Sequence, residues 1–176
     1  RTWAQHGERT LLIEADLRKP RLARRLGLNA GPGLAEVLAG SADASDAMTR
    51  DPAGPLHVLP GGNAGARQAA RLAGPDLPAL VQAAAQHYDR IVLDAPPVLP
   101  VHDAVHLAQA ADTCLLAVRW RRTPPATAQQ AVTELTRAGA DLAGVALTRV
   151  TPRRYGETAS GDAVAYGARA RAYYAG

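Results

Sequence analysis

The sequence of 176 residues contains no phenylalanine, one cysteine and one lysine. The lone cysteine, Cys114 in the apolar segment TCLLAVRW, rules out a framework of internal disulfides and is expected to be a buried thiol in a reducing compartment. No apolar run reaches the length of a membrane-spanning helix, and no signal-peptide pattern is present. With 47% hydrophobic residues, the chain is expected to form one globular domain whose core is built from Leu, Ile, Val and Ala.

Aromatic residues are also scarce, at 4% of the chain, and the formal net charge is only +4. The arginines are spread along the sequence without interleaved aromatic side chains. This pattern argues against a nucleic-acid-binding surface. It suits phosphate-bearing small ligands or acidic peptides.

Short apolar segments alternate with segments that have helical spacing, which predicts right-handed parallel crossovers. The expected fold is a three-layer α/β domain with a mainly parallel sheet. A helix is also expected to end at Gly7, ahead of the first strand. Strands are predicted at residues 9–16, 56–60, 90–97, 113–120 and 143–150, and helices at 19–28, 31–40, 76–88, 102–111 and 124–139.

Acidic residues follow two of the predicted strands. Glu14 and Asp16 end LLIEAD, and Asp94 ends IVLD. Because ligands of open parallel sheets bind beyond the carboxyl ends of the strands, these acids are candidates for a magnesium site. The alternative is that Glu14 and Asp16 pair with nearby arginines or cap the following helix.

Six segments in order resemble the bacterial tyrosine kinases: LLIEADLRKPRL, GLAEVLAG, LHVLPGG, YDRIVLDAPPVLPVHDAVHLAQAAD, LLAVR and GVALTRV. These kinases are the autokinases of capsular and exopolysaccharide export, and they are related to the MinD and ParA ATPases. The resemblance covers nearly the whole chain. It implies a P-loop fold in which LLIEADLR is similar to the acidic Walker A-prime motif and IVLDAPP to Walker B.

The resemblance implies ATP and Mg²⁺ as cofactors and a role for each acid. Asp94 would support magnesium, Glu14 would serve the metal and catalysis as the first A-prime acid, and Asp16 would be the base for the tyrosine hydroxyl. Arg18 would neutralise phosphate, unless it pairs with Asp16 at the surface. Asp103 matches an acid of the family, or caps a helix.

The chain departs from the family pattern at two of these positions. Glu14 stands where the family usually has Asp, so its carboxylate lies one methylene further out. Thr148 precedes Arg149 where the family usually has Asn, in the segment near the adenine. Thr148 and Arg149 are therefore the expected nucleotide contacts.

A third departure is larger, because the sequence contains no Gly-x-x-x-x-Gly-Lys-Ser/Thr loop to cradle the phosphates. Its only lysine, Lys19, follows Arg18 in the A-prime segment. We expect the loop to precede Arg1 in a longer protein. Residues 1–152 would then be a partial kinase domain that is inactive alone, followed by a flexible tail at 153–176.

The tail is rich in tyrosine and small residues. In the family such tyrosines are phosphorylated in trans by a neighbouring subunit, although a merely solubilising tail would explain the composition too. Homo-oligomers and a membrane-anchored polysaccharide co-polymerase, fused or separate, are the expected partners, at the cytoplasmic face of the membrane. The candidate acceptors are Tyr155, Tyr166, Tyr173 and Tyr174.

Two other functions are compatible with these motifs. A MinD- or ParA-like switch would hydrolyse ATP without forming phosphotyrosine. A non-catalytic interaction module would keep the fold and lack nucleotide chemistry. The tyrosine-rich tail favours the kinase.

Overall fold

The computed structural model describes residues 1–151, so the tail tyrosines and the predicted boundary at 152/153 lie outside the described residues. Strands and helices alternate along most of this length. The strands are β1 (Thr10–Glu14), β2 (Thr49–Arg50), β3 (His57–Leu59), β4 (Arg90–Asp94), β5 (Cys114–Arg119) and β6 (Leu142–Thr148). The helices are α1 (Thr2–Gln5), α2 (Leu22–Leu26), α3 (Leu34–Leu38), α4 (Ala44–Ala47), α5 (Ala66–Ala69), the 3-10 helix η1 (Ala70–Ala73), α6 (Asp76–Ala84), α7 (Asp103–Gln109) and α8 (Pro125–Arg137).

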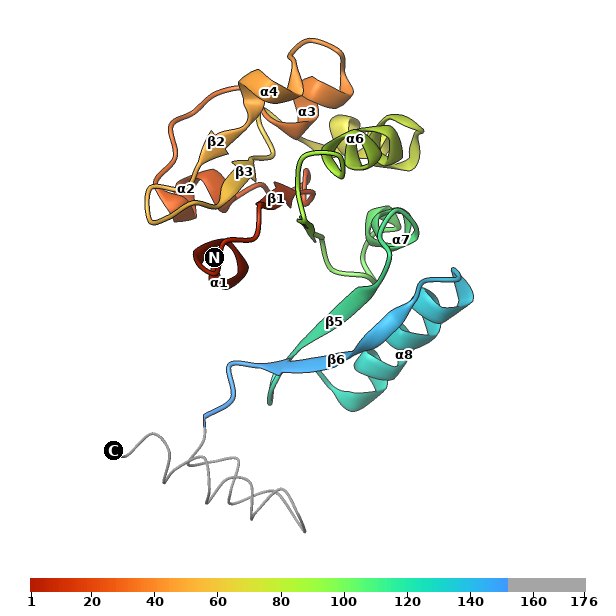
Figure 1. Ribbon diagram of the computed structural model, residues 1–176. Helices are drawn as coiled ribbons and strands as arrows, with labels where there is room; N and C mark the ends of the chain where they lie inside the picture. The colour runs from red at the N-terminus through yellow and green to blue at the C-terminus, as the bar shows by residue number, and fades with distance from the viewer. Residues whose placement is uncertain (152–176) are drawn as a thin grey trace, which may run out of the picture.

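The described strands form two hydrogen-bonded groups. The first has the order β2-β3-β1-β4, in which β1 runs parallel to both β3 and β4 while β2 is antiparallel at the edge. The second is the parallel pair β5-β6. Figure 1 shows this pair and α8 apart from the four-stranded sheet, with α7 between them. The predicted α/β class is thus confirmed.

Strand β1 is apolar at consecutive positions because both faces of its sheet are covered. Leu11 and Ile13 are fully buried in one core cluster, with residues of α3, α6 and α7. Leu12 packs in a second cluster against α1 and α2, represented by Ala4 and Leu22. A strand with two buried faces has the continuous apolar run seen here rather than an alternating pattern. This arrangement gives the three layers.

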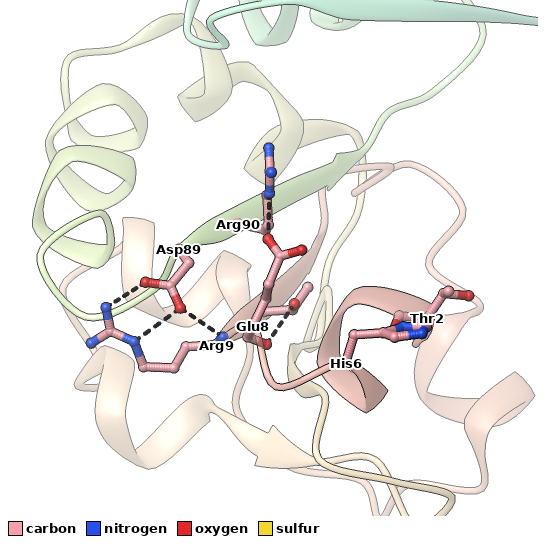
Figure 2. A network of polar contacts seen from close by, with 7 residues as sticks. Thr2, His6, Glu8, Arg9, Asp89 and Arg90 are labelled. Carbon is pink, nitrogen blue, oxygen red and sulfur yellow. Dashed lines mark hydrogen bonds and ion pairs between the residues drawn. The ribbon is translucent and has the colours of Figure 1, made fainter.

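Ion pairs tie the amino ends of β1 and β4 together (Figure 2). Arg9 donates to Asp89 through its backbone N, at 2.8 Å, and through its guanidinium, at 3.1 and 2.5 Å. Arg90 donates to Glu8 at 2.7 Å. The hydrogen bonds from Arg9 lower the pKa of Asp89 to about 2. These exposed contacts lie at the end of the sheet away from Glu14 and Asp94.

The structure contains elements that the sequence patterns did not predict. The sequence patterns gave no element at the segments now seen as α4, β2, α5 and η1, each of which is only two to four residues long. The expected helix end at Gly7 is confirmed, since α1 stops at Gln5 and Gly7 has a φ of 93°. Within residues 1–151, no helix is both long and apolar enough to cross a membrane.

Candidate functional site

The three strand-end acids come together at one edge of the sheet. Glu14 and Asp94 are register partners in the parallel pair β1/β4. Beyond the strand, the backbone N–H groups of Ala15 and Asp16 both donate to the carbonyl of Asp94, at 2.9 and 3.1 Å. The chain therefore turns across the end of β4, which holds Asp16 beside Asp94.

The Asp94 carboxyl is the group whose charge this edge destabilises. Partial desolvation raises its pKa, and the negative charges of Glu14 and Asp16 raise it further, while Arg25 opposes them. The Asp16 carboxylate accepts one hydrogen bond, from the N–H of Lys19 at 3.2 Å. Carboxylates that repel each other in this way favour a bound cation. Asp16 and Asp94 are the acids open to such a cation.

The Glu14 carboxylate is placed differently, because its side chain is buried and bonded to the backbone. Glu14 is 3% exposed. Its Oε1 accepts the N–H groups of Arg21 and Leu22, the second at 2.5 Å, and its Oε2 accepts the N–H of Gly61 at 2.8 Å. Glu14 thus connects the end of β1 to the start of α2 and to the loop after β3.

A second junction, which is partly buried and which the sequence reasoning missed, surrounds the loop of residues 60–63. Glu36 of α3 accepts the N–H groups of Gly33 at 2.8 Å and Asn63 at 3.1 Å. The backbone of α3 also bonds the loop, because Leu34 donates to Pro60 at 2.7 Å. Both partners of this junction lie in segments noted in the sequence, Glu36 in GLAEVLAG and the loop in LHVLPGG. Neither segment alone indicates that the two meet in space.

Arg18 forms an ion pair that neither sequence interpretation anticipated. Its guanidinium donates to both carboxylate oxygens of Asp103, at 2.5 and 3.1 Å. The hydrogen bond to Asp103 raises the pKa of Arg18. The alternative in which Arg18 pairs with Asp16 at the surface is wrong in this geometry. The alternative in which Asp103 caps a helix is wrong too, because His102 occupies the N-cap of α7. The pair joins the loop carrying Asp16 to α7.

Thr148 and Arg149 lie at the carboxyl end of β6, in the second strand pair. The Thr148 hydroxyl donates to the carbonyl of Val118 on β5 at 3.3 Å, and Arg149 has a left-handed φ of 56°. No described hydrogen bond or ion pair in residues 1–151 joins either residue to Asp16 or Asp94. Their predicted contact with a nucleotide stays a prediction.

The donor set at the sheet edge is suited to magnesium bound together with phosphate. Within residues 1–151, no group of three or more His, Cys, Asp and Glu side chains could hold a metal by itself. Magnesium is commonly held by one or two carboxylates, with water and substrate phosphates as its other ligands. Asp16 and Asp94 fit that requirement.

The chain is similar in sequence to curated proteins and similar in fold to solved structures. No protein-family model matches the chain. The chain is 31% identical over 152 residues to the putative tyrosine-protein kinase EpsB of Ralstonia solanacearum, covering 86% of this chain and 20% of that protein. It is 37% identical over 124 residues to the succinoglycan biosynthesis transport protein ExoP of Rhizobium meliloti, covering 69% and 16%. The chain thus spans about a fifth of the length of these curated relatives.

Solved structures with a similar fold include a kinase domain and an ATPase. The VpsO kinase domain superposes with a TM-score of 0.79 and 33% identity, covering 85% of this chain and 74% of that one. The cell division ATPase MinD of Pyrococcus furiosus superposes with a TM-score of 0.68 and 25% identity, covering 82% and 60%. The fold at this site is that of nucleotide-binding kinase and ATPase domains.

Proposed function

Because the chain belongs to the family of bacterial tyrosine-protein kinases, we propose that it is part of an ATP-dependent autokinase that phosphorylates tyrosines of its own tail. The convergence of Asp16 and Asp94 at the ends of β1 and β4 carries this proposal. The kinase phosphorylated on its tail would regulate polymerisation and export of a capsular polysaccharide or exopolysaccharide. The similarity to ExoP, which is named a succinoglycan biosynthesis transport protein, supports that context.

The proposed roles follow from the position of each side chain. Asp94 and Asp16 would hold Mg²⁺ together with the phosphates of ATP, and Asp16 would also accept the proton of the attacking tyrosine hydroxyl. When bound, Mg²⁺ neutralises the charge that develops on the transferred phosphoryl group. Arg18, fixed by Asp103, would keep the loop of Asp16 in place. Thr148 and Arg149 remain the proposed contacts of the nucleotide base.

The sequence of these 176 residues has no phosphate-binding loop, and we propose that polypeptide outside them supplies it. Within residues 1–151, β4 pairs with β1 alone and β5 with β6 alone, so each has an unpaired edge. Apart from Trp3, the exposed large hydrophobic side chains of this part are Leu115, Val145 and Leu147, all on β5 and β6. We propose that a strand carrying the loop pairs between β4 and β5, where it and its following helix would cover Leu115 of β5.

A serine at position 115 tests this arrangement. Leu115 is 64% exposed here, so Leu115→Ser should barely change the stability of the 176-residue chain. In a longer polypeptide that contains the proposed strand and helix, the same change should lower the free energy of unfolding by about 2 kcal/mol, because a buried leucine is lost. Urea unfolding of both lengths measures the difference. Equal effects in the two lengths would contradict the arrangement.

Incubation of the longer polypeptide with Mg-ATP tests the kinase function. Phosphotyrosine should appear, and it should fall to background when Tyr155, Tyr166, Tyr173 and Tyr174 are all changed to Phe. Tyr88→Phe is the matched control, because Tyr88 lies in the folded part and contacts His57 at 2.7 Å. Mass spectrometry of tail peptides gives the acceptors. Labelling that persists in the fourfold variant would rule out the tail as substrate.

The likeness to MinD supports one alternative, an ATP-hydrolysing switch. It requires release of inorganic phosphate without phosphotyrosine in the same incubation. The partners of the kinase would be further copies of the protein, for transfer in trans, and a membrane-anchored polysaccharide co-polymerase. These partners would hold the domain at the cytoplasmic face of the membrane.

A further inference from the structure

The Glu14 carboxylate closes a loop in the backbone of the chain. It lies at the end of β1, and two of its donors, the N–H groups of Arg21 and Leu22, come seven and eight residues later. The third donor, Gly61, belongs to a different segment. One buried side chain thereby fixes where the loop of residues 15–20 leaves the sheet and where it returns.

Three backbone N–H groups use most of what this carboxylate can accept. A carboxylate has about four lone-pair positions on its two oxygens. A metal ion would have to displace amides that belong to the start of α2 and to the packed loop after β3. Buried N–H groups that lose their partner are costly, because no water replaces it. Glu14 is therefore unsuited to ligate a metal, in contrast to Asp16 and Asp94.

The loop of residues 15–20 is held at further points, and all of them set the position of Asp16. The N–H groups of Ala15 and Asp16 bond the carbonyl of Asp94, and Arg18 is paired with Asp103. Gly61 lies so close that a Cβ there would be 2.8 Å from the Cβ of Pro20 and 3.2 Å from Oε2 of Glu14. The loop after β3 thus packs directly against the loop that carries Asp16.

From this geometry we infer that Glu14 is a positioning residue, which closes the loop bearing Asp16, and not a magnesium ligand. Its effect on phosphoryl transfer rests on the proposed function, whereas its role in closing the loop does not. The glutamate length matters here. An aspartate carboxylate would lie roughly 1.5 Å short, by one C–C bond, of the amides that Glu14 reaches.

Hydrogen exchange in the longer polypeptide tests the inference without relying on activity. In Glu14→Gln and Glu14→Asp, the amides of Arg21, Leu22 and Gly61 should exchange at least about tenfold faster than in the wild type. The amide of Leu12 in β1 reports whether the sheet itself stays folded. Glu36→Gln is the matched control, which should speed exchange at Gly33 and Asn63 and leave Arg21 and Leu22 protected.

Magnesium dependence and amide exchange together separate positioning from ligation. If Glu14 positions Asp16, both variants should lower the rate of phosphotyrosine formation by about tenfold. Any rise in the half-saturating Mg²⁺ concentration should then accompany the faster exchange of Arg21, Leu22 and Gly61, because Asp16 is itself a proposed magnesium ligand. A half-saturating concentration raised by about tenfold or more, with unchanged amide exchange, would overturn the inference in favour of a metal ligand. If no phosphotyrosine forms in the wild type, the proposed function fails, and the amide exchange still decides the role of Glu14.

Discussion

Asp94→Asn should reduce phosphotyrosine formation by about a hundredfold or more, and it should also raise the melting temperature of the protein. The loss of activity follows because an amide cannot supply the negative oxygen that a magnesium-bound triphosphate needs at this position. The gain in stability follows because partial burial disfavours the Asp94 charge, and Glu14 and Asp16 repel it. Quantitative phosphotyrosine detection and thermal unfolding measure the two effects.

The stabilising effect of Asp94→Asn should depend on pH. The pKa of Asp94 is raised in the folded protein, so the folded state holds this proton more tightly than the unfolded chain does. The Asp94 contribution to stability is therefore lost as pH rises from its unfolded pKa, 3.8, through its folded pKa. Asp94→Asn should stabilise the protein at neutral pH and have little effect below the unfolded value.

Asp112→Asn provides the control for this substitution. Asp112 is an exposed residue between α7 and β5, and the change removes the same charge away from the acid cluster. It should leave both the activity and the melting temperature close to the wild type. Full activity in Asp94→Asn would end the proposed metal role of Asp94, and a lower melting temperature at neutral pH would contradict the repulsion between the acids.

Gly33→Ala should destabilise the fold by about 3 kcal/mol or more, through a clash with a neighbouring backbone. A Cβ at Gly33 would lie 2.2 Å from the carbonyl oxygen of Pro60 and 2.4 Å from the N of Gly62. Neither atom can rotate away as a flexible side chain could. Relief requires the loop after β3 to move, which also breaks the hydrogen bond from Leu34 to Pro60.

Gly31→Ala is the matched control, two residues earlier in the same segment. A Cβ at Gly31 would meet nothing within 4 Å, so this change should leave stability unchanged or raise it by about 0.5 kcal/mol, through a less flexible unfolded chain. Urea unfolding of the two variants gives the comparison. If Gly33→Ala were as stable as Gly31→Ala, the close packing of α3 on the loop after β3 would be wrong.

The sequence predicted the layers of this fold because its strong signals are local. The apolar run before Glu14, and the helical spacing in residues 76–88 and 124–139, each report burial of one element. The sequence did not predict α4, β2 or η1, since two to four residues show no measurable period. It also did not predict the separation of β5 and β6 from the other strands, because pairing depends on which strands lie side by side.

The candidate site shows the same division between local and distant information. Convergence of Glu14, Asp16 and Asp94 was predictable, since parallel strands end at a common edge. Contact between Glu14 and the start of the following helix was among the alternatives, and the structure shows it at Arg21 and Leu22. The partners that are distant in the sequence were not predicted. Arg18 pairs with Asp103 at a sequence separation of 85 residues, and Glu14 bonds Gly61 at a separation of 47. Nothing in LLIEADLR distinguishes an acid that faces solvent from one that faces buried amides.

The central place of β1 has a consequence for synthesis on the ribosome. Both of its partners come later in the chain, since β3 ends at Leu59 and β4 ends at Asp94. A nascent chain that has emerged only as far as α3 therefore exposes an apolar strand with no neighbour on either side. The order of translation leaves Leu11, Leu12 and Ile13 available to chaperones, or to another unfinished chain, until β4 has left the exit tunnel.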